Sequence, residues 1–236
     1  MTATWAAAAP VAASASACPS PKKAAKASLE LRAGEVGYVH DLDTAGIREV
    51  VNDLQGYVAG PWHLPLGLTV ADFTLRYETS FYYRKAQGGG HCVALAEARV
   101  SVGYDDITVY ISSDYPEGSC EYQAILAHEQ EHVEINRQVL KAHEDKLKHA
   151  LRRLLRGKKV IYAHTKSEAR AAYLNELRRQ LDGAVDRMAA DRNRKNGSID
   201  TQDSYRRVMA QCTNWDRDGS ASSTLIQTTE SHRHAE

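Results

Sequence analysis

The sequence lacks an excess of either charge and lacks a long apolar run. Lys and Arg number 30, Asp and Glu also number 30, and the formal net charge is zero. Dedicated nucleic-acid binders usually carry a basic surplus, so we expect no nucleic-acid partner. No stretch approaches the roughly 20 apolar residues of a membrane-spanning helix, so we expect no integral membrane segment. Hydrophobic residues still make up 43% of the chain, which is enough for a core and excludes full disorder.

The sequence also lacks any C-x-x-C pair, although it contains four cysteines, at positions 18, 92, 120 and 212. This absence argues against a cysteine zinc knuckle and against a thioredoxin-like site. If the protein is exported, at least one disulfide is expected, whereas buried reduced thiols would fit a cytosolic protein.

The first 17 residues, MTATWAAAAPVAASASA, are small and apolar, and they end in an A-x-A pattern. We interpret residues 1–17 as a signal peptide of a secreted or periplasmic bacterial protein, with a disordered Ala-rich tail as the alternative. Cys18 follows the expected cleavage site at once. Ala15 stands where a lipoprotein signal usually has Leu, so a lipoprotein is the less favoured reading.

The charges are unevenly distributed along the chain. Residues 35–134 contain 16 acids and 5 bases, whereas residues 135–217 contain 20 bases and 10 acids. Segments of opposite sign can face each other or alternate on a surface, and solvated helix faces are the simpler explanation.

The hydrophobic pattern predicts strands first and helices later. After a linker over residues 18–34, a short helix is expected over 44–57, with Thr44 as its cap. Alternating apolar residues over 66–86 and 92–112 predict a small antiparallel sheet of three or four strands. Residues 103–106 are expected to form a hairpin turn within it.

From Ser119 onward, the spacing of the apolar residues becomes that of a helix. We expect one helix from a Ser119 cap to Leu155 or Arg156, ended by Gly157, and a second over 165–194, ended by Asn196 and Gly197. A short third helix is expected over 204–211. The fold class is therefore α+β, with one domain over 35–217 and a disordered tail over 218–236.

The most specific pattern is H-E-x-x-H over residues 128–132. His128 and His132 are four residues apart, so they share one helix face and can reach one Zn²⁺ ion. Glu129 is rotated away from them and can act as general base on a zinc-bound water. The histidines also lie on or beside the apolar stripe of the predicted helix, which argues against a surface position. A pair of salt-bridged helix histidines is the alternative.

A catalytic zinc ion needs a third protein ligand. His143 is predicted to lie roughly 16 Å along the helix from His132, too far to share the ion. If the two long helices form an antiparallel hairpin turning near Lys159, then Asp186, Asp191 and the segment 196–205 come within reach. The same geometry brings Cys212 towards Cys120 and favours that disulfide, with Cys92–Cys120 as the alternative.

This order of a small sheet, a strand cysteine, H-E-x-x-H and a second long helix resembles a bacterial family of predicted secreted zinc-dependent proteases, over residues 35–215. The resemblance implies a zincin-like fold in which His128 and His132 are zinc ligands and Glu129 is catalytic. The family ends in Tyr-Asp-x-x-Thr-x-His-Gly, of which this chain keeps only the Asp, as Asp200. Asp200 is therefore the third metal residue that the resemblance implies. If the family's closing His is its third ligand, then Tyr205, which replaces that His here, or a neighbouring acid must serve instead.

We thus expect an exported zinc metallopeptidase that acts on a peptide or protein substrate. An association with the cell envelope is compatible with this expectation. The alternative is a non-catalytic zinc-binding or helical interaction protein of the bacterial cell envelope. Tyr205 could also donate a hydrogen bond to an oxyanion, although packing of its ring is the simpler role.

Overall fold

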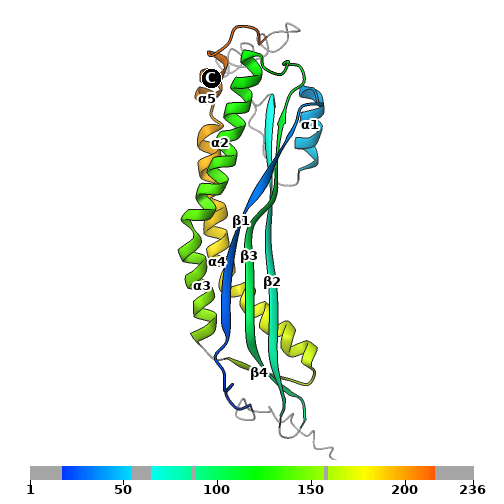
Figure 1. Ribbon diagram of the computed structural model, residues 1–236, viewed down its shortest axis with the longest axis vertical. Coiled ribbons are helices and arrows are strands. Elements are labelled where there is room, and N and C mark those ends of the chain that lie inside the picture. The colour runs from blue at the N-terminus through cyan, green and yellow to red at the C-terminus, as the bar shows by residue number, and fades with distance from the viewer. Residues whose placement is uncertain (1–17, 55–64, 87–88, 157–158, 216–236) are drawn as a thin grey trace, which may run out of the picture. The chain divides into compact units, whose positions relative to one another are not determined.

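The structure is a computed structural model that describes residues 18–54, 65–86, 89–156 and 159–215. The predicted signal peptide, the predicted tail over 218–236, and the predicted helix stop at Gly157 lie outside the described residues. The fold is α+β, as expected. Its elements in chain order are β1 (Lys26–Val39), α1 (Thr44–Asp53), β2 (Gly67–Lys85), β3 (His91–Ile111), α2 (Cys120–Ala142), α3 (Glu144–Arg156), β4 (Val160–Ala163), α4 (Lys166–Ile199) and α5 (Gln202–Met209), as Figure 1 labels them.

The sheet is mixed, so the prediction of an antiparallel sheet is wrong. The strand order is β1-β3-β2, and β4 pairs antiparallel with β3. Contacts between β1 and β3 advance in the same direction along both strands. Arg32 pairs with Asp105 at 3.1 Å, and His40 hydrogen-bonds to the Ile111 carbonyl at 3.0 Å. Strand β1 begins inside the segment 18–34 that was expected as a linker. It stands at the end of the strand order, where polar and charged residues are common and weaken the sequence signal.

The predicted hairpin turn at residues 103–106 is also wrong, because β3 runs unbroken through these residues. Tyr104 and Ile107 are both buried, so the alternation of inward-facing residues changes phase at Asp105–Asp106. Such a shift is typical of a β-bulge. Gly103 has φ 142°, and a Cβ there would lie 2.0 Å from the Arg32 carbonyl oxygen. The turn-forming residues therefore allow close approach of β1 instead of reversing the chain.

The single helix expected from Ser119 to Arg156 is two helices, α2 and α3, separated at His143. The His143 side chain is buried, and its Nε2 lies 3.2 Å from Asp191 Oδ2. Helix α4 continues five residues past the predicted end at Arg194. A strand, β4, occupies the region where only a turn near Lys159 was expected.

The structure also shows which residues cap the starts of α1 and α5. Helix α1 is capped by Asp43, whose side chain accepts from the Gly46 amide at 2.7 Å, and not by Thr44. The Thr44 hydroxyl instead donates to Asp114 at 2.7 Å. Helix α5 begins after a Thr201 cap, close to its predicted position.

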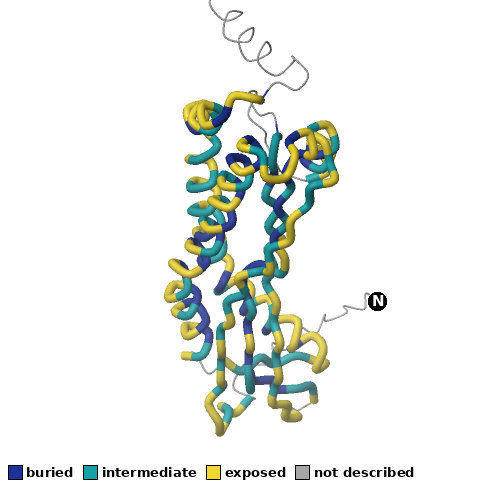
Figure 2. Tube along the Cα trace, turned by 45° about the horizontal axis from the view of Figure 1, so that its top comes forward, coloured by how far each residue is buried: buried dark blue, intermediate teal, exposed yellow. Residues whose placement is uncertain are grey.

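The described residues form two compact units. Unit 1 takes its residues from 18–30, 76–100 and 145–185, and unit 2 from 31–75, 101–144 and 186–215. Each unit has a core of buried apolar side chains, and buried and exposed positions alternate along its helices and strands (Figure 2). The fully buried side chains of unit 1 include Val93, Leu147, Leu177 and Leu181, and those of unit 2 include Ile47, Tyr104, Ile107 and Val139.

Each unit contains one disulfide. Cys120 is bonded to Cys212 in unit 2, which confirms the favoured prediction, and Cys18 is bonded to Cys92 in unit 1, which was not predicted. Disulfides are typical of proteins that mature in oxidising compartments. Among the described residues, no helix combines the length and the apolar character needed to cross a membrane.

Candidate metal centre

Helix α2 carries the H-E-x-x-H residues in unit 2. Its first turn is fixed by the Ser119 side chain, which accepts from the Tyr122 amide at 3.1 Å, as the sequence predicts. The two histidines lie side by side, with ring centroids 4.9 Å apart. Their side chains are only 13% and 12% exposed, so they face the interior of the unit and not the solvent.

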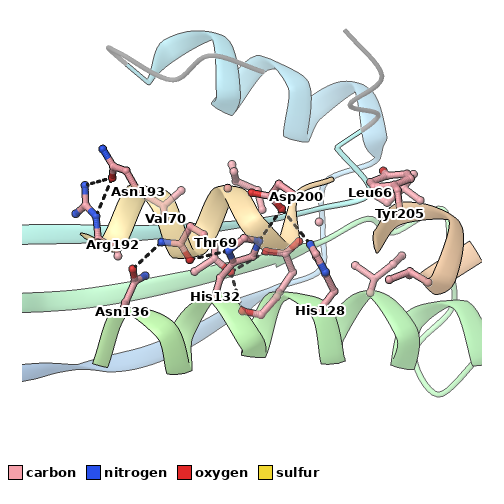
Figure 3. Close-up of a pocket in the computed structure, with 18 of the residues that line it drawn as sticks. Leu66, Thr69, Val70, His128, His132, Asn136, Arg192, Asn193, Asp200 and Tyr205 are labelled. Carbon is pink, nitrogen blue, oxygen red and sulfur yellow. Dashed lines mark hydrogen bonds and ion pairs between the residues drawn. The ribbon is translucent and has the colours of Figure 1, made fainter. Parts of the chain in front are cut away.

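Asp200 reaches both histidines from the connection between α4 and α5 (Figure 3). Its Oδ1 lies 3.3 Å from His128 Nε2 and 3.0 Å from His132 Nε2. The three side chains thus offer ligand atoms that all lie within 4.8 Å of one another, and they form a group that could hold a metal ion. The residues of the predicted metal site therefore come together.

Other acids considered from the sequence do not join this group. Asp191 hydrogen-bonds to His143, and Asp203 forms an ion pair with Arg206 on the surface of α5. Asp186 is exposed. His143 is engaged with Asp191 and not with the H-E-x-x-H histidines, in agreement with the helix geometry used to exclude it.

Glu129 is buried beside the two histidines. Thr69 of β2 donates to Glu129 Oε2 at 2.7 Å and holds this carboxylate in place. Burial raises the pKa of Glu129, against the opposing effect of the two neighbouring histidines. Gly67 explains how β2 approaches so closely, because a Cβ there would lie 2.7 Å from Glu129 Oε1.

A chain of two asparagines orients His132. Its Nδ1 lies 2.9 Å from Asn196 Oδ1, and Asn196 Nδ2 donates to Asn136 Oδ1 at 3.1 Å. An amide oxygen only accepts, so Nδ1 of His132 carries a proton, and its Nε2 is directed at Asp200. Asn196 lies inside α4, where the sequence predicts a helix end. Its two tertiary hydrogen bonds outweigh its weak helix propensity.

The electrostatics of the group are strongly coupled. Burial alone would lower the pKa of His132, but the hydrogen bond that His132 donates to Asp200 and the charge of Glu129 outweigh it and raise that pKa to about 9. Burial would raise the pKa of Asp200, yet the hydrogen bonds with His128 and His132 hold it well below its ordinary value. The cluster therefore pairs an ionised Asp200 carboxylate with a His132 side chain whose protonated form is favoured.

A pocket of about 620 Å³ opens onto these residues. The first residues of β2, Gly67–Ala71, and the preceding Leu66 form one wall. Residues of α2, α4 and α5, together with Leu54 and Asp200, form the rest. Tyr205 lines the pocket from α5, hydrogen-bonds to the Leu66 backbone, and has a pKa that burial raises. Figure 3 shows Tyr205 and Leu66 at one end and Arg192 with Asn193 at the other.

The donor set fits a divalent transition metal. In a tetrahedral site with bonds of about 2.0–2.1 Å, neighbouring ligand atoms lie about 3.3 Å apart, close to the separations of Asp200 Oδ1 from the two histidine nitrogens. Two imidazoles and one carboxylate suit zinc and related ions.

Sequence reasoning missed Thr69 and Asn136. Asn136 lies four residues after His132 on the same helix face, so a polar residue on an otherwise apolar stripe was a usable signal. Thr69 carries no comparable signal, because only the folded sheet brings it to Glu129. No protein-family model matches the chain, and comparisons with curated proteins and with solved structures find no match either.

Proposed function

We propose that this chain is a zinc-dependent peptidase of an extracytoplasmic compartment, with a zincin-like active site in unit 2. The observation that carries the proposal is the convergence of His128, His132 and Asp200 at one pocket, with the carboxylate of Glu129 buried beside them. The two disulfides support an extracytoplasmic location, since cytosolic proteins rarely keep such bonds.

In this proposal His128, His132 and Asp200 hold the ion. When bound, zinc would polarise a substrate carbonyl and lower the pKa of a coordinated water towards about 7. Glu129 would accept a proton from the water that attacks the substrate carbonyl. It would then pass this proton to the departing amine. Burial raises the pKa of Glu129 and so strengthens its carboxylate as a proton acceptor.

Two neighbours would assist Glu129 and the substrate. Thr69 keeps the Glu129 carboxylate oriented through its hydrogen bond of 2.7 Å. Tyr205 stays protonated because burial raises its pKa, so its hydroxyl would be able to donate towards an oxyanion in the pocket.

The strand that lines the pocket favours an extended peptide as the substrate. β2 ends the strand order β1-β3-β2, and no strand among the described residues pairs with its other side. An extended peptide would add to this edge through main-chain hydrogen bonds, beside the metal group.

The test is zinc content and cleavage of an unfolded protein such as casein, in wild type, His128→Ala and Glu129→Gln. We expect about one equivalent of zinc in wild type and in Glu129→Gln, and loss of zinc in His128→Ala. Glu129→Gln should lower turnover by about 10²–10⁴-fold while keeping the ion. Bound zinc without any cleavage would refute the peptidase and favour a non-catalytic zinc-binding protein. Absence of zinc uptake in wild type would refute the metal centre itself.

A further inference from the structure

The zero net charge of the chain conceals a separation of charge between its two units. The described residues of unit 1 contain 17 Lys and Arg but only 7 Asp and Glu, whereas those of unit 2 contain 10 and 19. The fold assembles each unit from three stretches of sequence, so the separation differs from the one visible along the chain. Even if every acid of unit 1 neutralised one base, ten positive charges would remain.

The cations of unit 1 are displayed on its surface. Helix α3 buries an apolar stripe through Leu147, Leu151 and Leu154 and exposes Arg152 and Arg153 on its other face. Bases near a helix C-terminus are favoured by the helix dipole, which could account for this group alone. It does not account for the exposed bases outside the helices, which are Lys22, Lys23, Lys26, Arg76, Arg84, Lys85, Arg99 and Lys159.

Three of these bases meet at a second pocket, of about 290 Å³. It lies between the segment 19–23 and the strand residues 82–84, and Lys22, Lys23 and Arg84 line it. The Cys18–Cys92 disulfide ties this segment to β3. No acidic side chain is among the residues that line the pocket. The pocket is therefore suited to an anionic group.

Two exposed aromatic rings accompany the bases. Tyr82 and Tyr83 also line the pocket, and each is 43% exposed. Lys166 lies over the Tyr83 ring, 5.2 Å from its centroid. Tyrosine with adjacent Lys and Arg is the composition that favours a lipid headgroup region, where the ring lies at the interface and the bases attract anionic lipids.

We propose that unit 1 docks the protein on an anionic phospholipid surface, with the pocket formed by Lys22, Lys23 and Arg84 receiving a headgroup phosphate. The attachment is peripheral, through charge and interfacial tyrosines. It does not depend on the metal centre, because the residues that carry it all belong to unit 1.

The experiment is co-sedimentation of the full chain with phosphatidylcholine vesicles, with and without phosphatidylglycerol, at about 0.1 M and about 1 M salt. We expect binding only to the vesicles with phosphatidylglycerol, and only at the lower salt concentration. A variant with Lys22, Lys23 and Arg84 each changed to Ser should bind them between about tenfold and a hundredfold more weakly.

The matched control changes three exposed bases of unit 2, Arg48, Arg187 and Arg207, to Ser and alters the net charge equally. It should keep its vesicle binding within about twofold, because these bases lie outside the proposed surface. Equal losses in both variants, binding to neutral vesicles, or no binding at all would overturn the proposal. Tighter binding of the wild type to duplex DNA than to the vesicles would also overturn it and assign the surface to nucleic acid.

Discussion

At the scale of single residues, the group of His128, His132 and Asp200 depends on side chains outside it for its orientation. His132 presents Nε2 to Asp200 because Asn196 accepts the proton at Nδ1, and Asn136 in turn orients Asn196. A bound metal ion would need a proton-free Nε2, and the hydrogen bond at Nδ1 favours that state. Outer partners of this kind commonly change metal affinity by about 10–100-fold.

We therefore predict that Asn196→Leu weakens zinc binding by about 10–100-fold, because Nδ1 of His132 loses its acceptor. Asn196→Asp should keep affinity near or above the wild-type value, since a carboxylate accepts the same hydrogen bond. Competition with a chromophoric chelator measures both affinities without any substrate. Asn175→Leu is the control, because Asn175 is an exposed residue of the same helix that does not line the metal pocket. Equal affinity in Asn196→Leu and wild type would contradict the assigned role.

The sequence predicts the residues of the metal group better than the residues around it. The spacing of His128 and His132 depends only on helix geometry, which is local and regular. A family resemblance and the geometry of a helical hairpin both predict Asp200 near the histidines, and it lies in the group. Thr69 could not be found in this way, because its contact with Glu129 spans 60 residues and is created by the folded sheet.

At the scale of elements, the segments that carry the site are held by the Cys120–Cys212 disulfide. Cys120 is the first residue of α2, and Cys212 follows α5, so the bond joins the helix of the histidines to the segment after Tyr205. Trp215 adds to this anchor, since its indole donates to the Met209 carbonyl at 2.7 Å and its own carbonyl accepts from Tyr115.

We predict that changing Cys120 and Cys212 together to Ser lowers the free energy of unfolding by about 2–5 kcal/mol and weakens zinc binding. The matched variant changes Cys18 and Cys92, whose disulfide lies in unit 1, which contains none of the metal group. It should lose stability but keep the wild-type affinity for zinc. Denaturant unfolding and chelator competition measure the two quantities. Unchanged zinc affinity in the first variant would show that the disulfide does not support the metal group.

Errors in predicting the elements arose where tertiary contacts overrule local signals. Gly103 and its polar neighbours have the composition of a turn, yet the glycine serves close packing of β1 on β3. Helix α2 ends at Ala142 although no Gly or Pro interrupts the pattern, and the buried His143, paired with the half-buried Asp191, lies at that break. Strand β1 has the alternating burial of a half-covered strand, but its Lys and Gly residues suggest a linker.

At the scale of the whole molecule, the metal group joins parts of the chain that are far apart in sequence. His132 and Asp200 are separated by 68 residues, and the whole of α3, β4 and α4 lies between them in the chain. An ion bound to both would close this long loop in the folded protein only, because the unfolded chain does not preform the site. Zinc should therefore stabilise the fold as well as serve the proposed chemistry.

We predict that removing zinc with a chelator lowers the melting temperature of the wild type. At a free zinc concentration 100 times the dissociation constant, binding contributes about 2.7 kcal/mol, which for a protein of this size corresponds to about 5–10 °C. Differential scanning fluorimetry measures the shift, and restored zinc should reverse it. His128→Ala should show a melting temperature that responds to neither the chelator nor added zinc, and Mg²⁺ should not replace zinc because it prefers oxygen ligands. An equal response in wild type and His128→Ala would mean that zinc acts elsewhere on the chain, and no response in wild type would mean that the folded group of His128, His132 and Asp200 is held by its own ion pairs alone.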